Sequence, residues 1–178
     1  MGLKDFWKSK KVLITGNTGF NGSWLSIWLD HLGADIRGYS LEPDNENSLF
    51  NILEIDNLFS TTTADIRDIE QLSNEINVFK PEIVFHLAAQ PLVKEAYLNP
   101  RETYEINIMG TINLLESALK SSSVKSFINV TSDKVYENKS WDWGYREVER
   151  LNGNDPYSNS KSCADLIASC YKNSLLEE

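Results

Sequence analysis

The sequence contains few of the residues that build disulfide scaffolds or metal sites. It has two cysteines and two histidines among 178 residues. Cys163 and Cys170 are seven residues apart in one predicted helix, without the C-x-x-C spacing or the neighbouring histidines of a metal site. We therefore expect two thiols, buried or on the surface, and no metal centre.

Positive charge and long apolar runs are also scarce. The 17 lysines and arginines are outnumbered by 26 aspartates and glutamates, and the net charge of −9 argues against a nucleic-acid or anionic-membrane partner. The apolar runs are shorter than a membrane span. The first residues are interrupted by charges, which argues against a signal peptide: Lys4, Asp5, Lys8, Lys10 and Lys11. With 41% hydrophobic and 24% charged residues, the chain is typical of a soluble globular protein, and we expect it in the cytoplasm.

Three glycines, spaced three apart, follow the first apolar run. Residues 11–15 predict a buried strand, and the helix that begins after the turn has apolar residues four apart: Phe20, Trp24, Trp28 and Leu32. A strand, a glycine turn and a helix present free backbone N–H groups and a positive helix end to a phosphate. Gly16 would permit the sharp turn, Gly19 the approach of a pyrophosphate, and Gly22 the packing of the helix on the sheet. An ordinary turn is the alternative.

The rest of the chain alternates between predicted strands and helices. Further strands are expected at residues 35–39, 58–65, 83–87 and 127–130. Helices are expected at residues 49–53 (a single turn), 68–79, within 91–100, at 101–120 and from 156 to the end. Residues 137–155 read as a charged, aromatic loop. Strands linked by helical crossovers form a doubly wound parallel α/β sheet, whose ligand crevice lies at the carboxyl ends of the strands.

The predicted helix over residues 101–120 has apolar residues on more than one side. Its main stripe consists of Ile108, Ile112, Leu115 and Leu119. Ile106 and Leu114 lie off that stripe and indicate a second buried face. The second face could be covered by the same domain or by another subunit, and the sequence does not decide between them.

Two clusters near the crevice carry groups that could do chemistry. Tyr157 and Lys161 are one helical turn apart, and a nearby cation stabilises a phenolate, so Tyr157 is a candidate general base. A solvated helix face is the alternative. The run Thr131, Ser132, Asp133 and Lys134 follows a predicted strand and is either an ordinary polar turn or part of a substrate site. We interpret His86 as a structural histidine, and Trp141 and Trp143 as packing or lid residues.

Five motifs together resemble the extended short-chain dehydrogenase/reductase family and cover nearly the whole chain. They are Gly16-x-x-Gly19-Phe20-x-Gly22, Asp65-Ile66-Arg67, His86-Leu87-Ala88-Ala89, Asn107-x-x-Gly110-Thr111 and Tyr157-x-x-x-Lys161. Four longer stretches, residues 86–92, 131–136, 143–147 and 155–161, are similar to the 4,6-dehydratases of that family that act on CDP-glucose. Sister nucleotide-sugar dehydratases usually carry a glutamate where this chain has Lys134.

This resemblance implies a Rossmann-type sheet and an NAD-dependent dehydration of CDP-glucose to a 4-keto-6-deoxy sugar. Tyr157 would take the C4 hydroxyl proton while NAD takes the C4 hydride, which later returns to C6 after water has left. Ser132 would bind the C4 oxygen, and Lys161 would hold the cofactor ribose and tune Tyr157. Asp133 would protonate the leaving hydroxyl, and Lys134 would remove the C5 proton.

The same resemblance implies a set of cofactor-binding residues. They are Gly16, Asn17, Thr18, Gly19, Phe20, Asn21, Gly22, Ser40, Asp65, Ile66, Leu87, Ala88, Ala89, Gln90, Asn107, Tyr157 and Lys161. NAD is favoured over NADP because a 2′-phosphate at the end of the second strand would face Glu42, Asp44 and Glu46.

Members of this family continue well beyond 178 residues. We therefore expect residues 1–178 to be a dinucleotide-binding domain that is incomplete at its C-terminal end, before the last strands and a smaller substrate domain. The strand at residues 127–130 would then be an exposed edge that favours association, and we expect a homo-oligomer, in its simplest form a dimer. Another epimerase or dehydratase of the family, and a catalytically silent NAD-binding fragment, are the alternative functions.

Overall fold

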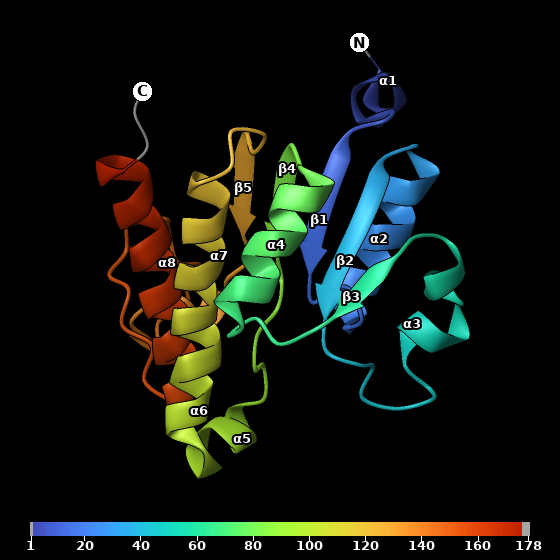
Figure 1. Cartoon of the computed structure of the whole chain (residues 1–178). Coiled ribbons are helices and arrows are strands. Elements are labelled where there is room, and N and C mark those ends of the chain that lie inside the picture. The colour runs from blue at the N-terminus through green and yellow to red at the C-terminus, as the bar shows by residue number, and fades with distance from the viewer. Residues whose placement is uncertain (1, 176–178) are drawn as a thin grey trace.

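The computed structural model describes residues 2–175, which form a parallel sheet between two layers of helices (Figure 1). The strand order is β3-β2-β1-β4-β5. The strands are β1 (Lys11–Thr15), β2 (Asp35–Ser40), β3 (Thr61–Thr63), β4 (Ile83–His86) and β5 (Ser126–Asn129). The doubly wound parallel sheet predicted from the sequence is confirmed.

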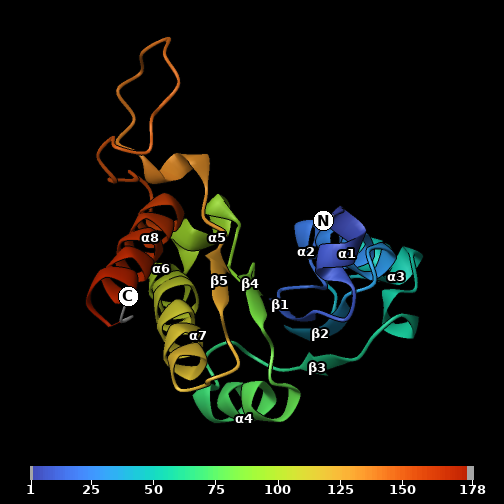
Figure 2. The ribbon, with the colours of Figure 1, turned by 90° about the horizontal axis from the view of Figure 1, so that it is seen from above.

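The helices lie on both faces of this sheet. The longer ones are α2 (Phe20–His31), α4 (Ile69–Phe79), α7 (Gly110–Leu119) and α8 (Pro156–Ser174). The short ones are α1 (Leu3–Trp7), α3 (Leu49–Ile52), α5 (Val93–Leu98), α6 (Pro100–Tyr104) and the 3₁₀ turns η1 (Ile55–Asn57) and η3 (Asp133–Val135). Figure 2 shows α4, α7 and α8 on one face, and α2 with α1 on the other. Within residues 2–175, none of these helices is long and apolar enough to cross a membrane.

Two predicted elements differ clearly in extent from those in the structure, and one helix was not predicted. The third strand was expected over residues 58–65, but only Thr61–Thr63 pair with β2, because η1 precedes them. The helix α1 was not predicted. The last helix was predicted to run to the end of the chain, and it ends at Ser174, while residues 176–178 lie outside the described part.

The aromatic stripe of α2 faces solvent instead of the sheet. Phe20, Trp24 and Trp28 are 69%, 55% and 56% exposed. The face that packs against the sheet carries the small residues Gly22, Ser23 and Ser26, followed by Leu29. Small side chains allow the helix backbone to lie close to the strands, so backbone proximity, and not the apolar stripe, decides which way this helix faces.

The predicted helix over residues 101–120 is divided by a π-helical segment, η2 (Glu105–Met109). Such a segment holds one extra residue in its turn and therefore rotates the two flanking helices relative to each other. The predicted stripe is only partly buried, since Leu115 is buried and Leu119 is exposed, while Leu114 of the predicted second face is fully buried in the core. The predicted second face is thus real, and the domain itself covers it.

The ends of the strands are level with one another, which places the site. Thr15, the last residue of β1, pairs with Tyr39 of β2 and with His86 of β4. His86 in turn pairs with Asn129, the last residue of β5. The segments that follow these strands therefore meet at one edge of the sheet. On its open side β5 forms the sheet edge, beside a groove of about 570 Å³ between α7 and α8; the association expected from this edge stays a prediction.

Candidate active site

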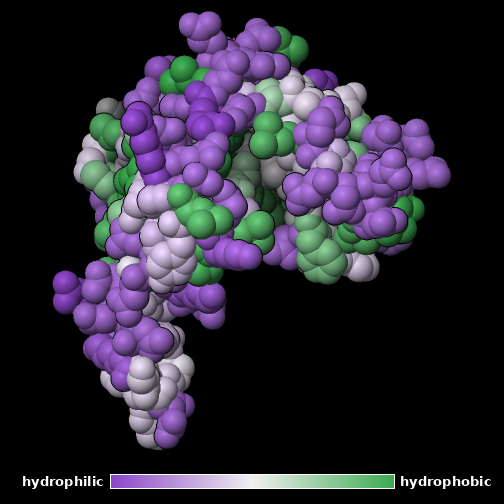
Figure 3. Space-filling view, turned by 90° about the horizontal axis from the view of Figure 1, so that it is seen from below, coloured by the Kyte–Doolittle hydropathy of each residue, from purple (hydrophilic) through white to green (hydrophobic). Residues whose placement is uncertain are grey.

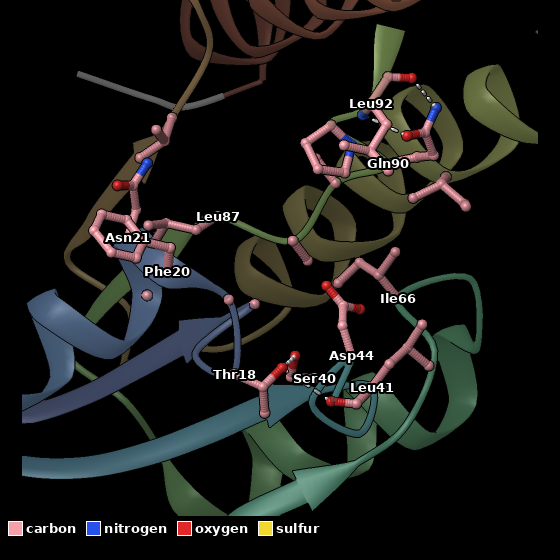
Figure 4. A pocket seen from close by; sticks show the side chains of 18 of the residues that line it. Thr18, Phe20, Asn21, Ser40, Leu41, Asp44, Ile66, Leu87, Gln90 and Leu92 are labelled. Atoms are coloured by element: carbon pink, nitrogen blue, oxygen red, sulfur yellow. Dashed lines mark hydrogen bonds between the residues drawn. The ribbon is translucent and has the colours of Figure 1, made fainter. Parts of the chain in front are cut away.

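A cavity of about 570 Å³ lies at the carboxyl ends of the strands. Figure 3 views this end of the molecule and shows the hollow, with apolar side chains inside it. Its walls come from segments that are distant in sequence: the glycine turn, the end of β2, the segment after β3, the segment after β4, Ile106, and the end of β5 together with the start of α8. In Figure 4, Phe20, Asn21 and Leu87 lie across the cavity from Gln90 and Leu92.

The glycine turn fits tightly against the loop that follows β4. Gly16 has a positive φ of 73°, and a Cβ atom there would lie 2.6 Å from the backbone nitrogen of Ala88. A Cβ atom on Gly22 would lie 2.1 Å from the carbonyl oxygen of Gly16. Side chains at either position would force the turn away from its neighbours, so both glycines are required by the shape of this wall.

The amino end of α2 opens into the cavity. The first bond of the helix joins the Ser23 N–H to the Gly19 carbonyl at 2.8 Å, which leaves the amides of Phe20, Asn21 and Gly22 without a helical partner. Within the described part of the chain, no side chain caps this end. A Cβ atom on Gly19 would meet only the Gly16 carbonyl oxygen, at 3.4 Å, so the remaining space beside Gly19 belongs to the cavity. Free amides, a positive helix end and open space fit a phosphate group.

The end of β2 forms an acidic wall. Thr18 Oγ1 lies 2.7 Å from Ser40 Oγ and donates to the Leu41 carbonyl at 3.0 Å, which ties the glycine turn to this strand (Figure 4). Glu42 and Asp44 line the cavity just beyond. This electrostatic setting disfavours an additional phosphate at this end.

The two arginines nearest to this wall are both paired with carboxylates. Arg37 binds Glu75 at 2.8 Å. Arg67 binds the carboxylate of Asp65 at 2.6 Å, and its hydrogen bond, partly offset by burial, lowers the pKa of that carboxyl group. Neither guanidinium is therefore poised to clamp an extra phosphate.

The opposite wall carries Tyr157 and Lys161. Asp155 caps α8 by accepting a hydrogen bond from the Ser158 N–H at 2.9 Å, and Pro156 begins the helix, so its first turn is fixed at the end of β5. Both Tyr157 and Lys161 line the cavity. The Lys161 ammonium donates to the Val130 carbonyl at 2.8 Å, and burial lowers the pKa of this lysine to about 8.

The segment after β5 forms a short capped turn. Thr131 lines the cavity, whereas Ser132, Asp133 and Lys134 follow it and do not contribute to the lining. Ser132 Oγ accepts from the Lys134 N–H at 3.2 Å and donates to Asp133 Oδ1 at 3.1 Å. Asp133 and Lys134 are exposed. The hydrogen bonds are those of a polar turn, and the position next to Thr131 keeps these side chains near the cavity.

Most of the expected cofactor-binding residues surround the cavity. Those that line it are Gly16, Thr18, Gly19, Phe20, Asn21, Gly22, Ser40, Asp65, Ile66, Leu87, Ala88, Ala89, Gln90, Tyr157 and Lys161. Asn17 and Asn107 are buried behind the walls instead: Asn17 donates to Thr61 Oγ1 at 2.8 Å, and Asn107 binds the backbone of Gln90. These two side chains support the site from behind.

Several lining residues were missed by the sequence reasoning. They are Tyr39, Ala64, Pro91, Leu92, Glu95 and Ile106. Tyr39 and Ala64 lie at strand ends, and Ile106 precedes the Asn107 motif, so the level ends of parallel strands and the motifs are the signals that could have identified them. Glu95 lies in α5, where the sequence carries no such signal. By contrast, the predicted loop over residues 137–155 contributes an arm, residues 137–150, that extends away from the body (Figure 2). In it Trp141 packs on Tyr145 at 5.6 Å, which fits the packing interpretation.

The comparisons with known proteins agree with this geometry. Residues 13–176 match the family model of GDP-mannose 4,6 dehydratase. The chain belongs to this family. The match confirms the resemblance inferred from the motifs.

Relatives within and around the 4,6-dehydratase family cover almost the whole chain. CDP-glucose 4,6-dehydratase of Salmonella typhimurium is 53% identical over 171 residues, which are 96% of this chain and 48% of the relative. dTDP-D-glucose 4,6-dehydratase of Dictyostelium discoideum is 35% identical over 187 residues, 97% of this chain and 43% of the relative. The chain therefore spans about half the length of the relatives it matches.

Solved structures share the fold. An epimerase from Methanothermobacter thermautotrophicus superposes with a TM-score of 0.84 at 25% identity, over 96% of this chain and 50% of that one. UDP-glucose 4-epimerase of Thermus thermophilus, in complex with NAD, gives a TM-score of 0.81 at 26% identity, over 92% of this chain and 51% of that one. The Rossmann-type sheet is thus shared with these epimerase structures.

Proposed function

We propose that this chain is the NAD-binding part of a nucleotide-sugar 4,6-dehydratase that acts on CDP-glucose. The observation that carries the proposal is the shape of the cavity: a free helix end on one wall and the Tyr157–Lys161 pair on the opposite wall. The identity of 53% to the Salmonella CDP-glucose enzyme supports the choice of substrate.

The cofactor fits the residues that are present. The amides at the start of α2 would bind the pyrophosphate, and the acidic end of β2 would bind the adenosine ribose. When bound, NAD takes a hydride from the sugar and returns it later, so the overall loss of water needs no external oxidant. The acidic wall and the two paired arginines favour NAD over NADP, because a 2′-phosphate would meet Glu42 and Asp44.

The residues on the opposite wall would move the protons. Tyr157 would take the proton of the C4 hydroxyl. Lys161, whose pKa burial lowers to about 8, keeps its positive charge near neutral pH and would hold the ribose and assist Tyr157. Oxidation at C4 makes the C5 proton acidic, because the carbanion is delocalised into the ketone.

The turn after β5 would complete the dehydration. Ser132 would bind the C4 oxygen, Lys134 would remove the C5 proton, and Asp133 would protonate the hydroxyl that leaves C6 as water. The Asp133 carboxylate accepts one side-chain hydrogen bond among residues 2–175, from Ser132, which leaves its other oxygen open to a ligand.

A cytoplasmic homodimer, with residues 1–178 forming its dinucleotide-binding domain, completes the proposal. It rests on the low cysteine content and the negative charge of the sequence, together with the exposed edge of β5.

Calorimetric titration of the chain with NAD and NADP tests the cofactor assignment. We expect NAD to bind more tightly, and Gly19→Val to weaken NAD binding about tenfold or more by filling the space at the helix end. Ser73→Ala is the matched control, because it removes a hydrogen bond to Ser117 of 2.8 Å, remote from the cavity. Equal binding of NADP would contradict the charge argument.

Product analysis with CDP-glucose and NAD tests the reaction. A 4-keto-6-deoxy sugar nucleotide supports the dehydratase, an epimerised sugar identifies an epimerase, and NAD binding without turnover identifies a binding module. If the dehydration occurs, Tyr157→Phe should abolish it, and Lys134→Ala should stop the reaction after oxidation at C4, with reduced cofactor accumulating.

A further inference from the structure

A continuous chain of buried hydrogen bonds runs behind the cavity and passes through His86. On one side, Thr15 Oγ1 accepts from the Ala88 N–H at 3.2 Å, so its own proton is free for His86 Nδ1, 2.7 Å away. On the other side, the Thr111 hydroxyl donates to the Asn107 carbonyl at 2.7 Å. The oxygen of Thr111 can therefore only accept from His86 Nε2, which lies 3.0 Å away. These bonds assign the neutral ring with its proton on Nε2.

From Thr111 the chain continues through the π-helical segment to α8. The Asn107 side chain accepts from the Gln90 N–H at 2.8 Å and donates to the Gln90 carbonyl at 3.1 Å. It also donates to Ser160 Oγ at 2.8 Å, and Ser160 donates to the Tyr157 carbonyl at 2.7 Å. The extra residue of η2 turns Asn107 inward to make these bonds.

Both ends of this chain therefore lie in the walls of the cavity. Ala88 and Gln90 belong to the wall after β4, and Tyr157 belongs to the opposite wall. The side chains between them are almost completely inaccessible, and His86 itself is 1% exposed. Among the described residues, the charged group that acts on the His86 ring is the Lys161 ammonium, and its positive charge disfavours protonation of the imidazole. A buried chain with each group satisfied can hold its ends at a fixed separation.

We propose that His86 is a positioning residue: as the neutral Nε2–H ring, it holds Thr111 and thereby Asn107, whose side chain joins the wall at Gln90 to the turn of α8 that carries Tyr157. The positioning of Tyr157 by His86 is inferred from these contacts alone. The effect of this positioning on turnover rests on the proposed dehydratase function. A reacting group displaced by about 1 Å can lose roughly 100-fold in rate.

Nuclear magnetic resonance of the 178-residue chain tests the ring directly. Long-range proton–nitrogen spectra distinguish the two neutral forms, and the chain has two histidines, so His31→Gln assigns the signals. We expect His86 to stay neutral with its proton on Nε2 between about pH 5 and 8. A proton on Nδ1, or a ring that becomes charged in this range, would overturn the proposal. This measurement requires neither NAD nor turnover.

Variants then test whether the ring acts on Tyr157. Thr111→Val keeps the shape of the side chain but breaks the chain of bonds, and Ser117→Ala removes a buried hydroxyl elsewhere on α7 as a control. The amide signals of Gln90 and Ser160 and the ring signals of Tyr157 should shift in Thr111→Val and stay in place in Ser117→Ala. At position 86, glutamine can still reach Thr111 whereas asparagine can reach only Thr15, so His86→Gln should disturb Tyr157 less than His86→Asn.

Turnover provides a second readout when the chain dehydrates CDP-glucose. The loss in Thr111→Val should then fall on kcat, by about 100-fold, with KM for the sugar changed less than about threefold. Unchanged Tyr157 signals in Thr111→Val and His86→Asn would refute the positioning role even if the chain binds NAD. Conversely, a chain that fails to bind NAD but shows the expected shifts would refute the proposed function and leave the positioning role intact.

Discussion

The two faces of the sheet are built in opposite ways. On the face covered by α4, α7 and α8, large apolar side chains interlock in one cluster, formed by Leu13, Tyr39, Ile66, Leu72, Ile76, Val84 and Leu114. On the other face, α2 approaches through glycine and serine and turns its aromatic residues outward. The first face depends on filled volume. The second has an apolar cluster of its own, which includes Val12, Ile14, Leu29 and Ile36, and depends in addition on close contact between the backbones of α2 and the glycine turn.

The difference follows from what each face must support. The α7 face carries the buried polar chain through His86, which has to be enclosed on all sides to hold its geometry. The α2 face brings a helix end against the proposed phosphate site, and there Gly22 passes close to the Gly16 carbonyl. Substitutions should therefore have different effects on the two faces.

The largest effect is expected for Leu114→Ala on the α7 face. Leu114 is completely buried, and the cavity left by its truncation should lower the free energy of unfolding by about 2–5 kcal/mol. Leu119→Ala, on the same helix but exposed, should cost less than about 1 kcal/mol. Urea unfolding measures both free energies of unfolding. Equal losses in the two variants would show that the buried volume of Leu114 does not stabilise α7.

Acidification should weaken the α7 face through His86. Burial, together with the Lys161 charge, lowers the pKa of this imidazole to about 3, below its ordinary value near 6.5. Between these values the unfolded chain binds a proton that the folded chain does not, so stability falls as the pH falls. His86 should contribute about 1.4 kcal/mol per pH unit in this range and nothing above it.

Unfolding measured from pH 7 to 4 checks this slope against two variants. His86→Gln should have a smaller pH dependence than the unaltered chain, whereas His31→Gln, at an exposed position, should match the unaltered chain. A slope that His86→Gln leaves unchanged would assign the acid sensitivity to other groups.

Removing one hydroxyl from the α2 face should stabilise the protein. Ser26 is completely buried, and among residues 2–175 its hydroxyl finds no hydrogen-bond partner. Ser26→Ala should therefore raise the free energy of unfolding by about 1 kcal/mol, since it removes an unsatisfied group and favours the helix. Ser23→Ala is the contrast: its hydroxyl donates to the Asn17 carbonyl at 3.2 Å, and its loss should cost about 1 kcal/mol. A destabilised Ser26→Ala would imply an unrecognised partner for that hydroxyl.

The smallest effects are expected for the outward aromatic residues of α2. Trp24→Ala and Trp28→Ala should each change the free energy of unfolding by no more than about 0.5 kcal/mol, because both side chains are more than half exposed. Trp7→Ala should cost more, since Trp7 packs against Phe85 with ring centroids 6.3 Å apart. A large loss at Trp24 in dilute solution would show that the stripe is buried after all.

The sequence predicted the order of elements well because each carries its own local signal. The apolar run of β1, the glycine turn and the capped start of α8 at Asp155 all depend on residues close together in the chain. The strand ends follow from the same pattern, and with them most of the cavity. Local periodicity and turn chemistry were sufficient for this part.

What the sequence could not predict depends on contacts between distant segments. The direction in which α2 faces is set by Gly22 passing the glycine turn, and the helix expected over residues 101–120 is interrupted by a π-helical segment. Asn107 was predicted to bind the cofactor, but its amide lies behind the wall because Gln90 and Ser160 meet it there. A regular helical wheel cannot represent any of these three features.

The outward position of the tryptophans has a consequence for optical measurements. Trp24, Trp28, Trp141 and Trp143 are exposed, and Trp7 is only partly covered. Tryptophan emission therefore reports mainly on the surface of α2 and on the arm, and it should change little when the hydrophobic core unfolds. Tyr39 is the fully buried aromatic side chain of the α7-face cluster. Tyrosine absorbance or circular dichroism will follow the loss of the core, and a melt recorded by tryptophan fluorescence alone will misjudge when the protein unfolds.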